Sequence, residues 1–263
     1  MSAVREQAEK FAMSYAFPVA NRLCDVAWGL APGGRWSCPA CGESGAFAPH
    51  LSIGGVRRHS RCPHCRASER HRLAYHAFHE RIAPSYVGTS PLIIHFAPEP
   101  TAAEWLTSLD GAYETADLFV EGVDHQVDIA DLPFENDSYD IVWASHVLAV
   151  IQDDHKALDE IGRILRPGGV AILPIPILGA ETIDYPEAVA GECDNWHGPG
   201  WDYEERFRAH FDRFEWFHSS DAPPTSQTFL YEDRSQWPSR AYPYRTSTAG
   251  HVHPDGIPIC WVD

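Results

Sequence analysis

The chain has 263 residues, 44% of them hydrophobic, which is enough apolar material for one large domain with a small accessory module. The formal net charge is −17, and residues 91–263 hold 31 acidic against 9 basic side chains, a balance that disfavours nucleic acid as a partner of that part. The sequence contains no apolar run of 18 residues and no signal-peptide core, so we expect a cytoplasmic protein without a membrane-spanning segment.

Residues 1–35 have the pattern of a helical cap. Apolar residues recur at helical spacing on both sides of Pro18, where we expect a break. The simpler interpretation is that the apolar side of this cap packs on the rest of the chain. A second interpretation is that the cap closes an active site, since lids often come from outside the core fold. The apolar residues in question are Phe11, Tyr15, Leu23, Val26, Ala27 and Leu30.

Two CPxC pairs lie in residues 36–68, at a spacing typical of a four-cysteine zinc site. The pairs are Cys38 with Cys41 and Cys62 with Cys65. Four thiolates complete a tetrahedron, so we expect a structural zinc ion that supplies folding energy to a short segment. The other three cysteines, Cys24, Cys193 and Cys260, have no partner spacing and fit small buried residues.

Six arginines crowd the zinc module and the residues after it. Three interpretations compete, in decreasing order of preference: a solvated face, a docking surface for the acidic part of the chain, and a grip on an anionic substrate. The residues are Arg57, Arg58, Arg61, Arg66, Arg70 and Arg72.

A strand, a tight loop and a helix are predicted around residues 91–100, PLIIHFAPEP. Residues 92–94 form the apolar strand, and a capping box of Thr101 and Glu104 places the helix start at Thr101. About twenty residues downstream, where a dinucleotide fold places an acid on a ribose, Asp117 follows a second strand.

Further strands and helices alternate through residue 178. The strand DIVWAS covers residues 140–145, and Asp153 and Asp154 can cap a helix that PGG, at residues 167–169, ends. The apolar strand VAILPIPI follows. Such alternation predicts an α/β fold with a Rossmann-like, doubly wound, mostly parallel sheet, in a domain that spans residues 69–263.

This order of motifs resembles the class I S-adenosylmethionine-dependent methyltransferases, of methyltransferase type 11 kind, over roughly residues 90–178. The resemblance is carried by LIIHFAPEP, the acid after the second strand, DIADLPFENDSYDIVWASHVL and DEIGRILRPGGVAIL. The two cysteine pairs followed by ASERHRL and HFAPE resemble a bacterial subgroup with an N-terminal zinc ribbon, which extends the likeness to about residue 36.

The resemblance implies S-adenosyl-L-methionine as cofactor and assigns residues to it. His95 stands where most of the family has an acid, and FAPEP replaces the family's glycine-rich loop. Glu99 would accept a hydrogen bond from the cofactor's amino group, Asp117 would hold the ribose hydroxyls, and Asp128 would meet the adenine amine. The expected set also contains Phe96, Ala97, Leu118, Ile129 and Ser145. Taken singly, an Asp after a strand is more often a turn residue, and it is the joint order that favours binding.

Methyl transfer is an in-line displacement, so the main task of such an enzyme is to hold donor and acceptor at attack distance. A base is needed only if the acceptor must lose a proton, and His146 and His197 are the candidates because imidazole titrates near neutrality. Residues 179–203, which include Trp196 and His197, are expected to form a substrate wall.

These features favour a methyltransferase that acts on a small-molecule, biosynthetic acceptor. One alternative is an RNA methyltransferase that uses the basic zinc module as its grip. A second alternative keeps the cofactor but changes the reaction, for example to a cyclisation. A third is a non-catalytic binding module that retains the fold as a scaffold.

Overall fold

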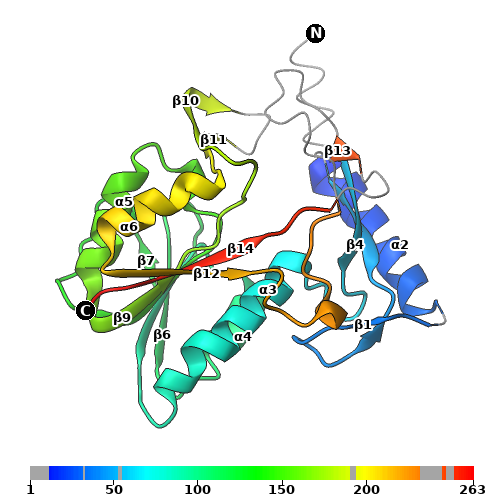
Figure 1. Cartoon of the computed structure of the whole chain (residues 1–263), viewed down its shortest axis with the longest axis horizontal. Helices are drawn as coiled ribbons and strands as arrows, with labels where there is room; N and C mark the ends of the chain where they lie inside the picture. Colours follow the sequence, from blue (N-terminus) through cyan, green and yellow to red (C-terminus); the bar gives the residue numbers. More distant parts are fainter. Residues whose placement is uncertain (1–11, 32, 53–54, 190–193, 232–244, 247–251) are drawn as a thin grey trace. The chain divides into compact units, whose positions relative to one another are not determined.

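The computed structural model describes residues 12–31, 33–52, 55–189, 194–231, 245–246 and 252–263 (Figure 1). The chain forms two compact units. The first unit contains Met1–Leu73 and Ser219–Asp255, and the second contains Ala74–His218 and Gly256–Asp263. Residues 219–255 therefore group with the N-terminal part, although the sequence placed all of residues 69–263 in one domain. Among the described residues, no helix is long and apolar enough to cross a membrane.

The second unit is built on a seven-stranded sheet with the order β12-β14-β9-β8-β5-β6-β7. Neighbours from β9 to β7 pair in parallel, and β14 pairs antiparallel with β9 and β12. The strands are β5 (Leu92–Phe96), β6 (Ala112–Asp117), β7 (His125–Gln126), β8 (Tyr139–Ala144), β9 (Leu165–Ile172), β12 (Arg213–His218) and β14 (Gly256–Trp261). This sheet confirms the predicted Rossmann-like α/β fold.

The strand order reverses between β5 and β8. The chain first moves outward from β5 to β6 and β7, and it then returns to the other side of β5 to form β8 and β9. In open α/β sheets of this kind, ligands bind beyond the carboxyl ends of the strands at the switch point.

Helices cover both faces of this sheet: α5 (Asp154–Ile164) and α6 (Glu204–His210) lie on one side and α4 (Pro100–Leu106) on the other (Figure 1). The inner side of α5 is apolar and buried in the main core. Asp153 caps α5, as predicted, because its carboxylate accepts from the backbone N–H of Lys156 at 3.1 Å. The chain also contains short helical turns. Phe78–Ile82 is a π-helical turn, and four others are 3-10 turns: Ala83–Tyr86, Leu148–Val150, Trp201–Tyr203 and Pro224–Ser226.

The predicted start of α4 is wrong by one residue. The helix begins at Pro100, with Glu99 in the N-cap position, and no side chain caps it. Thr101 and Glu104 therefore form no capping box. Proline suits the first helical position, because its φ is already helical and its missing N–H would have no partner there.

The first unit combines short strands with one long helix. β3 (Ala48–Ser52) pairs antiparallel with β4 (Gly55–Arg61), and β13 (Arg245–Thr246) pairs parallel with β4. The smaller pair of β1 (Trp36–Ser37) and β2 (Ser44–Gly45) flanks the first cysteine pair. The helical elements are a π-helical turn at Ala12–Ala16, α2 (Phe17–Gly29) and α3 (Glu69–Ala77), which crosses the boundary between the units.

Helix α2 packs on the strands through its polar residues, contrary to the sequence-based expectation. Asn21 donates to the Leu51 carbonyl (2.8 Å) and accepts from the Leu51 N–H (2.9 Å), and Asp25 pairs with Arg61. Pro18 lies in the first turn, so it starts the helix rather than breaking it. The apolar side chains that we expected to pack are between 59% and 80% exposed: Tyr15, Leu23, Val26 and Leu30. Phe11 lies outside the described residues.

Candidate functional site

A cavity of about 750 Å³ opens where β5 and β6 end, at the switch point of the sheet. We call it the switch-point cavity. Seven of the residues predicted for cofactor binding or catalysis line it: Phe96, Ala97, Asp117, Leu118, Asp128, Ile129 and His146. Its volume is in the range of small-molecule pockets.

His95 is completely buried, does not line the cavity, and contacts the loop that follows β5. Its Nε2 accepts from the backbone N–H of Glu99 (3.3 Å), so its Nδ1 carries the proton and donates to the Tyr113 hydroxyl (2.9 Å). Burial lowers the pKa of His95 to about 4, which keeps the ring neutral at pH 7. In the same loop Ala97 has a φ of 49°, a conformation that favours glycine.

The two acidic residues predicted to hold ribose and adenine each hold a turn. Oδ1 of Asp117, the last residue of β6, accepts from the N–H groups of Phe119 (2.7 Å) and Val120 (2.9 Å). Oδ1 of Asp128 accepts from the Ala130 N–H at 2.9 Å. Each carboxylate is thereby oriented through one oxygen, and within the described residues the structure gives Oδ2 of neither residue a hydrogen-bond partner. A turn residue can thus still offer an oxygen to a ligand.

Two other predicted cofactor residues do not line the cavity. Glu99 is the N-cap residue of α4, and Ser145 is buried directly after β8. His146, the next residue, does line the cavity. Its φ is 59°, and its N–H donates to the Pro174 carbonyl at 2.7 Å, so the backbone turns sharply where the chain leaves the sheet.

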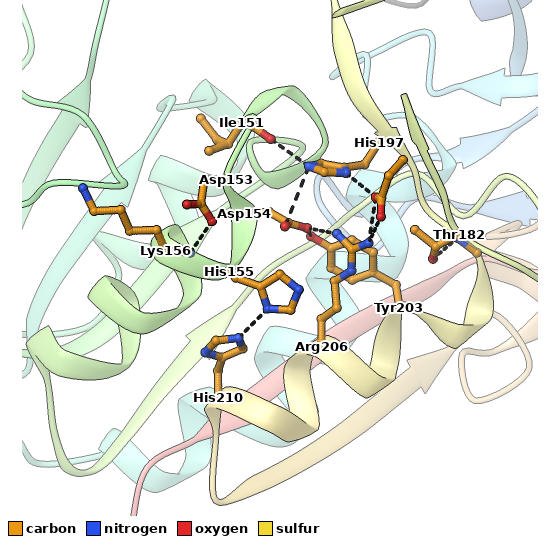
Figure 2. Close-up of polar contacts among 12 residues, drawn as sticks. Ile151, Asp153, Asp154, His155, Lys156, Thr182, His197, Tyr203, Arg206 and His210 are labelled. Atoms are coloured by element: carbon orange, nitrogen blue, oxygen red, sulfur yellow. Dashed lines mark hydrogen bonds and ion pairs between the residues drawn. The ribbon is translucent and has the colours of Figure 1, made fainter. Parts of the chain in front are cut away.

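His197 belongs to a second, adjoining cavity of about 650 Å³. It lies on a hairpin of β10 (Ile183–Val189) and β11 (Asn195–Gly198), and its side chain is buried. Nδ1 bonds to the Asp184 carboxylate on the facing strand (2.6 Å), and Nε2 bonds to the backbone carbonyl of Ile151 (2.9 Å) (Figure 2). Both ring nitrogens are therefore occupied.

Arg206 of α6 joins the hairpin to the start of α5. One of its terminal nitrogens donates to Asp154 (2.5 Å), and the other donates to both oxygens of Asp184 (2.7 and 2.8 Å) (Figure 2). The Tyr203 hydroxyl also donates to Asp154. Burial alone would raise the pKa of Asp184, but hydrogen bonds from Arg206 and His197 outweigh it and hold that pKa below its usual value. We call Asp154, Asp184, His197, Tyr203 and Arg206 the hairpin network.

The four cysteines of the CPxC pairs converge in the first unit. All four Sγ atoms lie within 4.8 Å of one another, and the Cys38–Cys65 and Cys41–Cys62 sulfur pairs are 3.6 and 3.7 Å apart. A tetrahedral zinc ion with Zn–S bonds of about 2.3 Å requires sulfurs roughly 3.8 Å apart. The donor set therefore fits zinc.

The two CPxC loops have the same backbone geometry. The Gly42 N–H donates to the Cys38 carbonyl and the Arg66 N–H to the Cys62 carbonyl, both at 2.8 Å. Gly42 and Arg66 both have positive φ, 76° and 65°. The N–H of each first cysteine donates to the carbonyl five residues on, Glu43 at 2.8 Å and Ala67 at 2.9 Å. Two matched turns thus present the four thiols to a common point.

Several of these six arginines form ion pairs or hydrogen bonds within the first unit. Arg72 is fully buried, lies over the Phe47 ring, and donates to four backbone carbonyls at 2.6 to 3.1 Å. Arg57 pairs with the buried Glu69 (2.7 Å), and Arg61 pairs with Asp25. The preferred interpretation, a solvated face, is wrong for these three residues. The carbonyls that Arg72 binds belong to Ser60, Ala67, Ser226 and Gln227.

No local sequence pattern indicates most of the hairpin network. Asp154 was predicted only as a cap, and neither Asp184 nor Arg206 stands in a motif. Their partners are 13 to 52 residues away in sequence, and only the folded hairpin brings them together.

Comparisons with known proteins find a similarity to methyltransferases in part of the second unit. Residues 102–173, which hold Asp117 and Asp128, match the sequence model of a family described as Methyltransferase domain. Demethylmenaquinone methyltransferase of Clavibacter sepedonicus is 38% identical over 69 residues, which cover 24% of this chain and 28% of that protein. Methyltransferase GfsG of Streptomyces halstedii is 35% identical over 79 residues, which cover 28% of each. The chain thus spans little more than a quarter of the length of these relatives.

The solved structure of the YcgJ protein from Bacillus subtilis is similar over 72% of this chain and 99% of its own, with 13% identity and a TM-score of 0.44. The segment that matches the family model, residues 102–173, lies within the second unit.

Proposed function

We propose that this protein is an S-adenosylmethionine-dependent methyltransferase that binds its cofactor in the switch-point cavity and methylates a small molecule. The observation that carries the proposal is the joint presence of Asp117 and Asp128 in one cavity, inside the segment that matches the methyltransferase family. In this assignment Asp117 accepts from the ribose hydroxyls and Asp128 from the adenine amine. Leu118 and Ile129 supply the apolar surface beside the base.

Bound there, the cofactor supplies an electrophilic methyl group. The chain's contribution is to position the acceptor and to exclude water. We assign His146 as the candidate general base, because it lines the cavity and follows β8 at the switch point. His197 is assigned a positioning role instead, since both of its nitrogens are already hydrogen-bonded.

We further propose that Cys38, Cys41, Cys62 and Cys65 hold a structural zinc ion. The sulfur separations and the matched turns of the two loops support this assignment. Four thiolate ligands leave no open coordination position, so the ion would stabilise the first unit rather than take part in methyl transfer.

The RNA methyltransferase alternative has less support. Three of the six arginines, Arg57, Arg61 and Arg72, bind groups of the first unit itself. They are therefore not available to bind RNA phosphates. RNA affinity that falls steeply with added salt would favour this alternative over a small-molecule acceptor.

Calorimetric titration of the full chain with S-adenosylmethionine and S-adenosylhomocysteine tests the proposed function, with adenosine triphosphate as a control ligand. We expect one site that binds both cofactor forms and excludes the control. No binding of either form would overturn the proposal and leave the fold as a scaffold. Release of S-adenosylhomocysteine on addition of an acceptor would then distinguish methyl transfer from a cyclisation.

A further inference from the structure

The hairpin of β10 and β11 is tied down at its base. The Gly200 N–H donates to the Thr182 hydroxyl (3.0 Å), and both the N–H and the hydroxyl of Thr182 donate to Asp202 (2.7 and 2.6 Å). Gly200 crosses the chain so closely that a Cβ there would lie 2.4 Å from the Glu181 backbone. Only glycine fits this crossing, which fixes how the hairpin leaves the domain.

The middle of the hairpin is tied down by the hairpin network. Asp184 and His197 face each other across the two strands, and Arg206 and Asp154 bind them from α6 and α5 (Figure 2). Both nitrogens of His197 face oxygens that only accept hydrogen bonds, an ionised carboxylate and a carbonyl. The ring is thereby held from two sides, by the facing strand and by the backbone at Ile151.

These ties set the place of Trp196, the residue before His197. Consecutive residues of a strand point to opposite faces, so fixing the His197 ring also fixes the strand from which the indole projects. Trp196 lines both the switch-point cavity and the adjoining one. In the switch-point cavity it shares the lining with the apolar side chains of Val147, Val150 and Ile151.

Charged side chains also lie at this end of the cavity. Asp154 and Asp184 bind Arg206 and His197. Asp153 caps α5, and Lys156 and Asp194 line the switch-point cavity itself. The indole of Trp196 supplies a flat aromatic surface in this lining, on which a ring can stack.

We propose that Trp196 is the specificity-determining residue on the acceptor side, and that it selects a planar, ring-bearing acceptor. The indole and the Val147 and Val150 side chains line the same cavity, and we call this part of it the slot. Asp184, His197 and Arg206 act as positioning residues that hold the indole in place. This inference rests on the proposed function, because it assigns the rest of the cavity to the cofactor.

A matched pair of probes tests the slot. The full chain is saturated with S-adenosylhomocysteine, and calorimetry measures the affinity of 2-naphthol and of decahydro-2-naphthol, its saturated, non-planar counterpart. We expect 2-naphthol to bind about tenfold or more tightly than the saturated probe, since stacking on an aromatic side chain contributes about 1–3 kcal/mol. Equal affinities, or no binding of 2-naphthol, would overturn the proposal.

Substitutions at Trp196 locate the selectivity. Trp196→Ala should lower 2-naphthol affinity about tenfold, whereas Trp196→Phe, which keeps a ring, should stay within about threefold. Affinity for S-adenosylhomocysteine should change by less than about twofold in both variants, because Trp196 is assigned to the acceptor. An equal loss of both affinities in Trp196→Ala would place the residue on the cofactor side and contradict the proposal.

The positioning role has its own readout, the ratio of the two probe affinities. Arg206→Met should reduce this ratio, because a loosened hairpin no longer holds the indole in place. Arg208→Met is the matched control, since Arg208 lies on the same helix and pairs with Glu204 at the surface (3.5 Å). A ratio that is unchanged in Arg206→Met would contradict positioning, even if the variant were less stable.

The two proposals fail in different ways. If S-adenosylhomocysteine does not bind the wild-type chain, the proposed function fails. If it binds but the probe ratio is near one, only the inference about Trp196 fails.

Discussion

The two units are held together in different ways. In the first unit, which also holds the cluster of four cysteines, buried charged side chains have partners within the unit: Arg61 pairs with Asp25, Glu69 pairs with Arg57, and Arg72 binds backbone carbonyls. In the second unit, an apolar core of strands and helices holds the sheet, and Asp117 and Asp128 stand at the rim of a cavity. In the first unit, where the apolar core is small, polar contacts and the proposed zinc ion stabilise the fold. In the second unit the apolar core is larger, and Asp117 and Asp128 are available for a ligand.

Removing a zinc ligand tests the first half of this contrast and should have the largest effect. In Cys62→Ser we expect the bound zinc to be lost and residues 36–67 to lose their protection from hydrogen exchange, because structural zinc can supply about 10 kcal/mol or more. The second unit should keep its protection. Cys24→Ser, a cysteine outside the cluster, should retain one zinc per chain by metal analysis. Full zinc content in Cys62→Ser would refute the assignment.

Arg72 tests whether a buried cation stabilises the first unit. Arg72→Met leaves four backbone carbonyls without their donor and should reduce the free energy of unfolding by about 3–5 kcal/mol in urea denaturation. Arg72→Lys should not restore it, since one ammonium cannot reach the same carbonyls. The exposed Arg58→Met should change it by about 0.5 kcal/mol or less. A loss under about 1 kcal/mol in Arg72→Met would contradict the role.

His95 gives the second unit a specific acid sensitivity. Its pKa falls from 6.5 to about 4 on folding, because burial disfavours the charged ring. The unfolded state therefore binds the proton first: stability is full above pH 6.5 and falls as the pH drops toward 4, by up to about 3 kcal/mol.

His95→Asn should remove this component, so the free energy of unfolding should fall less steeply between pH 6.5 and 4 than in the wild type. Urea denaturation at several pH values measures both slopes. Parallel curves for the two proteins would show that His95 is not held neutral by folding.

A substitution of Asp117 tests whether the carboxylates at the cavity of the second unit bind a ligand, and its expected effect is the smallest. Asp117→Asn keeps an Oδ1 that accepts from Phe119 and Val120 but loses the charge, so the turn should survive. We expect affinity for S-adenosylhomocysteine to fall about 10- to 100-fold, as for a lost charged hydrogen bond. Asp124→Asn is the control, because Asp124 binds Thr115 nearby without lining the cavity. Equal affinity losses in the two variants would remove the case for a specific contact.

The sheet and the cysteine cluster were predictable because local patterns specify them. Near-continuous apolar runs at β5, β8 and β9 predict buried parallel strands, and two CPxC pairs predict a converging thiol set. Asp117 and Asp128 could be placed at strand ends by spacing alone, and both line the cavity.

The remaining features depend on tertiary contacts that local patterns do not encode. Periodicity predicts that the apolar side of α2 is buried, but Asn21 and Asp25 find partners on β3 and β4, so the polar side packs instead. The hairpin network depends on the register that places Asp184 opposite His197. In the same way, the start of α4 was set by Pro100 and not by the capping box.

The most direct test of the central claim is hydrogen exchange of the full chain with and without S-adenosylhomocysteine. The claim predicts new protection in the peptides that contain residues 96–97, 117–120 and 128–131, which line or flank the switch-point cavity. Residues 36–67 should show no change. Protection confined to the first unit, or none at all, would contradict the assignment of this cavity to the methyl donor.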